Sequence, residues 1–127
     1  MPALFESLSF RRGPAMKNRF MLAPLTNQQS HADGVLSDDE FRWLTMRAEG
    51  GFGLTMTCAA SVQDGGQGFL GQLGAHDDRH IPGLARLASA LRAQETHAVL
   101  QLHHAGMRSP AALIGRASCR ERVYHPV

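Results

Sequence analysis

Apolar and polar residues follow one another along the chain in blocks that predict strand, helix, strand, helix and strand. The first strand is expected over residues 19–23, because Pro24 cannot donate a hydrogen bond to a sheet ladder. Two later apolar runs, 52–58 and 98–102, have the length of strands that are covered on both faces. Strands that alternate with helices in this way predict an α/β fold with a parallel sheet.

Two stretches have the spacing of amphipathic helices. Ser37 stands at an N-cap position with Glu40 three residues later, which is the pattern of a capping box, and Gly50 ends this helix after Glu49. The second helix is expected over 81–93, since a proline at its second residue is tolerated in a first turn. Its apolar stripe is predicted to consist of Ile81, Leu84, Leu87, Ala88 and Leu91.

The remaining segments lack such periodicity. Residues 8–11 and 15–17 flank a Gly-Pro turn and predict a short two-stranded ribbon. Residues 59–80 form a long glycine-rich connection, and loops of this length are often functional. This connection is not a phosphate-binding P-loop, because no Gly-Lys-Ser or Gly-Lys-Thr follows its glycines.

Composition predicts one small soluble domain. The chain has 127 residues, of which 43% are apolar and 19% charged. It lacks an apolar run of about 18 residues and an amino-terminal signal sequence, so we expect neither a membrane span nor export. Cys58 and Cys119 make no disulfide framework, which favours a reduced, cytoplasmic location.

The net charge of +2 arises entirely in the last fourteen residues. Residues 114–127 contain three arginines and one glutamate, so residues 1–113 are neutral overall. The body of the chain therefore gives no support for nucleic-acid binding.

Candidate chemistry gathers where the predicted strands end, at 24–28, 58–61 and 101–104. Parallel strands place these ends at one edge of the sheet, where α/β proteins carry their sites. His103 and His104 are interpreted as wall or supporting residues rather than catalysts. Cys58 is interpreted as a buried small residue, because the sequence offers it no partner.

Three segments, 21–27, 47–54 and 101–106, resemble the old yellow enzyme family of flavin-dependent NAD(P)H oxidoreductases and ene-reductases. The resemblance runs over residues 3–113 in the right order and spacing. It implies that residues 1–113 are the N-terminal portion of an eight-stranded TIM (β/α)8 barrel, about three βα units preceded by the short β-ribbon. Residues 114–127 do not continue the pattern. Their first ten residues look like one reading frame of a sequencing adapter, so this tail is expected not to be native.

The resemblance also implies a function and a set of cofactor contacts. The full-length parent would use FMN and pass hydride from NAD(P)H to the flavin and on to an activated alkene or a similar small-molecule acceptor. Thr26 matches the position whose hydroxyl donates a hydrogen bond to the flavin C4 carbonyl. Ala59 matches the second-strand position whose backbone approaches the same edge of the ring. Gln101 matches the third-strand amide, which has both a donor and an acceptor. The positions implied in flavin binding are Ala23, Pro24, Leu25, Thr26, Ala59 and Gln101.

Several points stay open at this stage. Gln28 stands where many family members have an aromatic residue, which leaves the substrate preference undetermined. No residue of this chain is assigned as acid or base, no metal is expected, and a homo-oligomeric parent is left open. The chain by itself is expected to be inactive, since its sheet would keep open edges. The alternatives are an inert or small-molecule-binding barrel fragment, or another TIM-barrel enzyme that has no flavin.

Overall fold

The computed structural model describes residues 3–110 and 112, and it contains a three-stranded parallel sheet. The strands are β1 (Met21–Leu22), β2 (Leu54–Ser61) and β3 (His97–His103), and β2 lies between the other two. The predicted order of strands and helices and the parallel sheet are therefore confirmed. The tail predicted at 114–127 lies outside the described residues.

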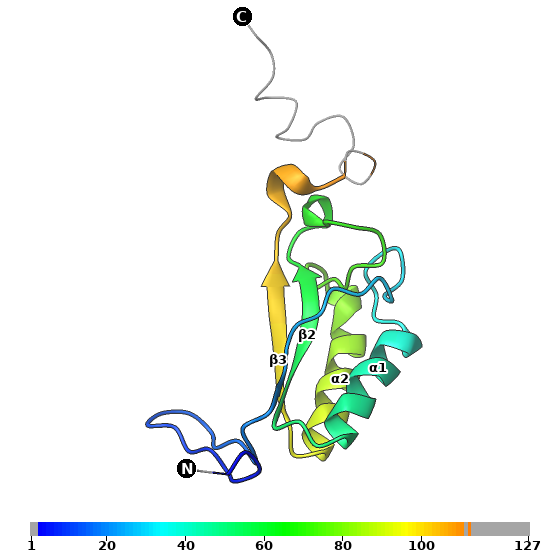
Figure 1. The fold of residues 1–127 in the computed structure, drawn as a ribbon. Helices are drawn as coiled ribbons and strands as arrows, with labels where there is room; N and C mark the ends of the chain where they lie inside the picture. Colours follow the sequence, from blue (N-terminus) through cyan, green and yellow to red (C-terminus); the bar gives the residue numbers. More distant parts are fainter. Residues whose placement is uncertain (1–2, 111, 113–127) are drawn as a thin grey trace, which may run out of the picture.

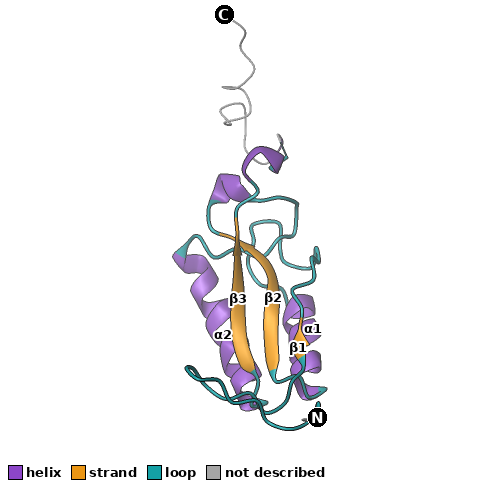
Figure 2. Cartoon of the chain, turned by 60° about the vertical axis from the view of Figure 1, so that its left-hand side comes forward, coloured by secondary structure: helices purple, strands orange, loops and turns teal. Residues whose placement is uncertain are grey.

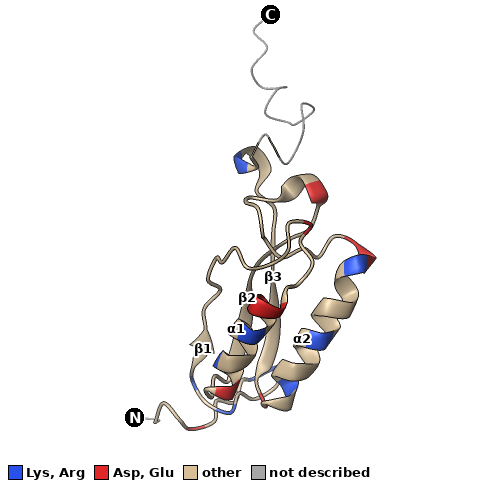
Figure 3. Ribbon diagram, turned by 90° about the vertical axis from the view of Figure 1, so that its right-hand side faces the viewer, with Lys and Arg blue, Asp and Glu red and all other residues tan. Residues whose placement is uncertain are grey.

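Both long helices cover the same face of the sheet (Figure 1). These are α1 (Asp38–Glu49) and α2 (Ile81–Ala93), and the described residues leave the opposite face without a covering helix. Acidic and basic residues occur on the helices and connections, whereas β2 and β3 carry none (Figure 3). The sheet therefore has one face buried under helices and one neutral, uncovered face.

The core lies between the helices and the covered face. Its buried apolar residues come from the strands, the helices and the connections between them. They are Leu22, Leu36, Leu44, Ala48, Cys58, Ala60, Leu73, Leu87 and Leu91.

Helix α1 begins as the sequence predicts, but its capping box is incomplete. The Ser37 hydroxyl accepts a hydrogen bond from the Glu40 backbone N–H at 3.1 Å. The Glu40 carboxylate does not turn back to Ser37; it lies fully buried and accepts hydrogen bonds from Ser30 and Cys58. Gly51, with φ of +102°, follows the helix and allows the turn that ends it.

Helix α2 has the predicted bounds, with Pro82 in its first turn. Leu87 and Leu91 are buried as predicted, but Ile81 is 57% exposed. Ile81 is the first residue of the helix and does not belong to the buried part of the stripe. An ion pair of 2.7 Å between Arg86 and Asp38 joins the exposed sides of the two helices.

The strand bounds differ from the prediction. Only Met21 and Leu22 pair in β1, because the Asn18 side chain accepts a hydrogen bond from the Phe20 N–H and turns the chain before the strand. Strand β2 begins at Leu54 and continues to Ser61, three residues beyond the predicted end, because its last residues still pair with β3.

Connections make up the rest of the described chain. The predicted ribbon is reduced to one antiparallel bridge between Leu8 and Met16. Three short 3-10 helices, η1 (Asp64–Gly66), η2 (Asp78–His80) and η3 (Gly106–Arg108), lie in the connections. No helix in the described part of the chain is both long and apolar enough to cross a membrane.

Candidate functional site

The three strands run parallel, so their carboxyl ends lie at the same edge of the sheet (Figure 2). The segments that leave this edge begin after Leu22, Ser61 and His103. Thr26 follows the first strand, and the long glycine-rich connection follows the second. This edge is where sites of α/β folds lie, and it contains the predicted site residues.

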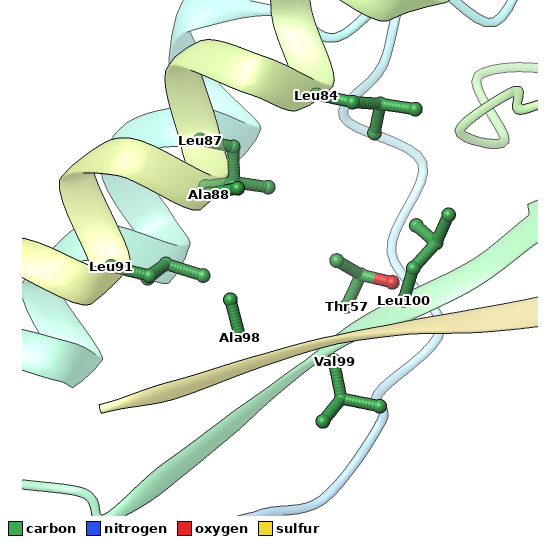
Figure 4. A pocket seen from close by; sticks show the side chains of 8 residues that line it. All are labelled: Thr57, Leu84, Leu87, Ala88, Leu91, Ala98, Val99 and Leu100. Atoms are coloured by element: carbon green, nitrogen blue, oxygen red, sulfur yellow. The ribbon is translucent and has the colours of Figure 1, made fainter.

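Along strand β3, successive side chains point alternately to the two faces of the sheet. Ala98 and Leu100 point toward α2, while Val99 points away from it (Figure 4). Gln101 and His103 follow Val99 at intervals of two, which places them on the uncovered face. The predicted flavin ligand Gln101 therefore lies on the face that no described helix covers.

In strand β2 an irregularity in the pairing places Ala59 on the uncovered face as well. The pairing of β2 with β3 shifts between Met56 and Ala59. Within this shift, Thr57 lines the cleft under α2 and the Cys58 thiol contacts Glu40 of α1, so two consecutive residues face the helices. The extra residue restores Ala59 to the uncovered face, as a β-bulge does when it re-aims a side chain.

Ala59 and Gln101 are neighbours across the sheet. They are register partners in β2 and β3, and the Gln101 N–H donates to the Thr57 hydroxyl at 3.2 Å. Within residues 3–110 and 112, no hydrogen bond occupies the Gln101 side-chain amide. A donor and an acceptor therefore stand free beside a small side chain on the uncovered face.

The first-strand loop follows β1 at the same edge of the sheet. Ala23, Leu25 and Thr26 are exposed, and Pro24 is half-buried. No hydrogen bond in the described part of the chain joins Thr26 to Ala59 or Gln101. The structure thus pairs Ala59 with Gln101, and among the described residues no hydrogen bond joins the loop residues 23–26 to either of them.

The loop is held in place by a buried carboxylate. Glu40 accepts a hydrogen bond from the Cys58 thiol at 2.7 Å and another from the Ser30 hydroxyl. Burial, and then the nearby Glu40 carboxylate, raise the pKa of the Cys58 thiol well above its usual range. Cys58 therefore remains a protonated, buried thiol, in agreement with its interpretation as a structural residue.

Gln72 is a polar residue of this edge that the sequence analysis missed. It is fully buried, and its amide contacts β2, β3 and the glycine-rich connection. It lies in a segment without periodicity, where only tertiary contacts distinguish one polar residue from another. Sequence pattern therefore had no signal for it.

Histidines of the long connection form a second cluster. The rings of His76 and His80 are 4.6 Å apart, and His76 lies 3.4 Å from the Ser61 hydroxyl. His80 is 2% exposed, and burial is the main cause that lowers its pKa below the usual value. In the part of the chain that the structure describes, no three acidic, histidine or cysteine side chains form a metal-binding group.

An apolar cleft of about 220 Å³ lies between α2 and the sheet (Figure 4). It is lined by four residues of α2 and four of the strands, namely Leu84, Leu87, Ala88, Leu91, Thr57, Ala98, Val99 and Leu100. Because it opens on the helix-covered face, it is separate from the Ala59–Gln101 pair.

The residues at the carboxyl edge fit a flavin. An isoalloxazine ring needs apolar walls and hydrogen-bonding groups at its pyrimidine edge. Pro24 and Leu25 supply apolar surface, and the free Gln101 amide supplies a donor and an acceptor. Beside Thr26, both polar atoms of the Asn27 amide are buried without a partner among the described residues, so this loop holds further hydrogen-bonding capacity.

Comparison with known proteins identifies the same family from sequence and from structure. The sequence profile of the NADH:flavin oxidoreductase / NADH oxidase family matches residues 3–122. The chain is 40% identical over 111 residues to the probable NADH-dependent flavin oxidoreductase YqiG of Bacillus subtilis, covering 87% of this chain and 30% of that protein. It is 35% identical over 106 residues to NADH:acrylate oxidoreductase of Vibrio harveyi, covering 84% of this chain and 10% of that protein.

Among solved structures, the old yellow enzyme homologue from Zymomonas mobilis superposes with a TM-score of 0.82 at 25% identity. The match covers 92% of this chain and 32% of that one. The chain thus spans about a third or less of the length of these relatives.

These similarities confirm the predicted resemblance to the old yellow enzyme family and the predicted fold class, an N-terminal portion of a TIM barrel. The family uses FMN with NAD(P)H as reductant, so both cofactor predictions agree with it. The assignment of individual residues to the flavin and the boundary at residue 113 remain predictions.

Proposed function

The chain belongs to the NADH:flavin oxidoreductase / NADH oxidase family, and we propose that it supplies the first three strands of an FMN-dependent NAD(P)H oxidoreductase. The observation that carries this proposal is the pairing of Ala59 with Gln101 on the uncovered face, at the carboxyl edge of a parallel sheet. When bound, FMN supplies the hydride-transfer chemistry, and the residues of this chain hold and orient it.

Each segment has a distinct part in this proposal. The side-chain amide of Gln101 binds the pyrimidine edge of the ring, where an N–H and a carbonyl stand side by side. Ala59 keeps the approach to that edge open, because its side chain is a single methyl group. The Thr26 hydroxyl donates a hydrogen bond to the C4 carbonyl of the flavin. The residues Ala23, Pro24 and Leu25 form the adjoining wall of the flavin site.

The acceptor is proposed to be an activated alkene or a similar small molecule. One relative is named as an NADH:acrylate oxidoreductase, and acrylate is an alkene activated by a carboxylate. Gln28 is a polar, exposed residue of the first-strand loop, which follows β1 at this edge. We therefore propose an acceptor that carries a polar, oxygen-containing group.

The apolar surface of β3 supports the proposal that further βα units follow in the intact enzyme. Leu100 and Leu102 face the helix layer, yet they are 36% and 63% exposed. In a complete barrel a following helix would cover such residues, as α2 covers its own part of the sheet. The chain by itself is accordingly proposed to be inactive.

The decisive experiment is to clone the gene beyond codon 113, purify the product (here called the full-length protein), and remove unbound flavin by gel filtration. We expect a yellow protein whose flavin absorbance bleaches with NADH or NADPH under anaerobic conditions and returns when acrylate is added. A protein of residues 1–113 is expected to be colourless. A colourless full-length protein that stays colourless after FMN is added would favour the flavin-free barrel enzyme, and a yellow 1–113 protein with a cooperative melt would contradict the proposed inactivity.

Resequencing of the locus through codon 113 tests the assignment of the tail. We expect adapter sequence in place of genomic sequence after that codon. An intact genomic reading frame through residues 114–127 would contradict this assignment.

A further inference from the structure

Gln72 connects β2, β3 and the glycine-rich connection at the carboxyl edge of the sheet. Its side chain is fully buried, and it contacts the Gly68 backbone, the Ala59 carbonyl and the ring of His103. A buried amide with three partners is held in one orientation, and that orientation determines what its neighbours can do.

The two backbone contacts distinguish the oxygen of the Gln72 side-chain amide from its nitrogen. The Gly68 N–H can only donate, and it lies 2.7 Å from Gln72 Oε1. The Ala59 carbonyl can only accept, and it lies 2.8 Å from Gln72 Nε2. An exchanged amide would set two donors against each other at one contact and two acceptors at the other, so this assignment is fixed by the network.

The orientation of Gln72 in turn fixes the tautomer of His103. The second hydrogen of Gln72 Nε2 points to His103 Nδ1 at 3.1 Å, so Nδ1 must accept. A neutral imidazole that accepts at Nδ1 carries its hydrogen on Nε2. His103 is therefore a hydrogen-bond donor at Nε2.

The donor atom is placed where a ligand can reach it. No group in residues 3–110 or 112 bonds His103 Nε2, and this atom is not among the buried polar atoms without a partner. His103 lies two residues beyond Gln101 on the uncovered face. The glycine-rich connection lies against its Cε1 side, since a Cβ on Gly68 would be 3.6 Å from that atom.

We propose that Gln72 is a positioning residue that holds His103 as the Nε2–H tautomer, so that His103 donates a hydrogen bond to a carbonyl or carboxylate oxygen of the electron acceptor. The tautomer follows from the contacts alone, whereas the identity of the ligand rests on the proposed function. A purely structural role for Gln72 would tie the connection to the sheet but would leave the ring of His103 free to carry its hydrogen on either nitrogen.

Nitrogen NMR of the full-length protein with ¹⁵N-labelled histidine tests the tautomer directly. We expect the Nε2–H form for His103 in the wild type and a mixture of tautomers in Gln72→Leu. Gln72→Glu places an acceptor opposite Nδ1, so a hydrogen should appear on Nδ1. A wild-type His103 that carries its hydrogen on Nδ1 alone, or a tautomer that is the same in all three folded proteins, would overturn the proposal.

His104 is the internal control in the same spectra. Its Nδ1 accepts from the Gly106 N–H at 3.0 Å, and its Nε2 lies 3.1 Å from the side-chain oxygen Oε1 of Gln63. It therefore has the same expected tautomer without any contact to Gln72. Its signals should not move in either Gln72 variant, and a matching change in both histidines would indicate a general loss of structure and contradict the specific role.

Steady-state kinetics with acrylate as acceptor tests the ligand contact. We expect His103→Leu to raise the KM for acrylate about tenfold, because one hydrogen bond to a charged oxygen is lost. His103→Gln, which keeps a donor, should recover part of that loss. If flavin bleaching by NAD(P)H is normal and KM is unchanged in His103→Leu, the ligand contact is wrong while the proposed function stands; if no flavin binds, the proposed function fails and the NMR result stands.

Discussion

The Glu40 carboxylate accepts a hydrogen bond of 2.7 Å from the Cys58 thiol, and both residues are buried, at 0% and 1% exposure. The same carboxylate accepts from Ser30, which follows the first-strand loop. Glu40 thus joins helix α1 to the loop on one side and to the irregular part of β2 on the other. It holds two of the three segments that build the proposed flavin edge.

Removal of this carboxylate is expected to destabilise the full-length protein. Glu40→Ala leaves the Ser30 hydroxyl and the Cys58 thiol buried without an acceptor, which should lower the free energy of unfolding by about 3 kcal/mol. Urea unfolding measures this change. Glu49→Ala, at an exposed position of the same helix, is the matched control and should cost less than about 0.5 kcal/mol. Equal effects of the two substitutions would refute the anchoring role of Glu40.

The protonated state of Cys58 predicts low chemical reactivity. Since burial and Glu40 raise its pKa, almost no thiolate is present near neutral pH. In the native full-length protein, iodoacetamide should leave the peptide that contains Cys58 unmodified, and in urea the same peptide should be modified completely. Mass spectrometry distinguishes this cysteine from any other. Rapid modification of the native protein would show that the thiol is accessible and ionised.

Gly74 is predicted to tolerate no side chain. A Cβ at this position would lie 2.5 Å from Cε1 of His80, whose ring is buried, so the ring would have to shift within the packed interior. Gly74→Ala should therefore lower the free energy of unfolding by about 2 kcal/mol. The control is Gly68→Ala, where the nearest atom would be 3.4 Å away and the expected cost is under 1 kcal/mol. A mild Gly74→Ala would mean that the His76–His80 cluster is loosely packed.

His80 predicts a loss of stability at acid pH. Burial lowers its pKa in the folded state, with contributions from His76 and Arg79. The unfolded chain therefore binds a proton to this ring at a higher pH than the folded chain does. Below about pH 6.5 the unfolded state gains protons first, so the free energy of unfolding falls as the pH decreases, and the contribution is fully present above that value.

Urea unfolding at about pH 7.5 and 5.5 measures this pH dependence. The wild type should lose more stability on acidification than His80→Gln does. His31→Gln, at an exposed position, reports the effect of losing any histidine. An identical loss in wild type and His80→Gln would show that another group controls the acid response.

The helices were predictable because their signals are local. Pro82 and the leucine stripe set the bounds of α2, and Ser37 with its following acidic residues set the start of α1. The parallel sheet, and the position of Gln101 at the end of a strand, followed from the alternation of strands with helices along the chain. These features depend on residues close together in the sequence, so the hydrophobic and capping patterns can predict them.

The remaining features depend on contacts between distant segments. Glu40 satisfies the capping pattern, yet its carboxylate is drawn to Ser30 and Cys58. The bulge that turns Ala59 to the uncovered face arises from the pairing of β2 with β3, and the residue pattern of 54–61 does not predict it. Gln72 acquires its role only because three segments converge on it.

The affinity of the full-length protein for FMN, measured in Gln101→Leu, tests the flavin edge most directly. Gln94→Leu, the same substitution at an exposed position directly after α2, is the control. If Gln101 binds the pyrimidine edge beside Ala59, its loss should raise the Kd for FMN about tenfold, or about 1.4 kcal/mol, while Gln94→Leu leaves it unchanged. An unchanged Kd in folded Gln101→Leu would contradict the proposal that this edge of the sheet holds the flavin.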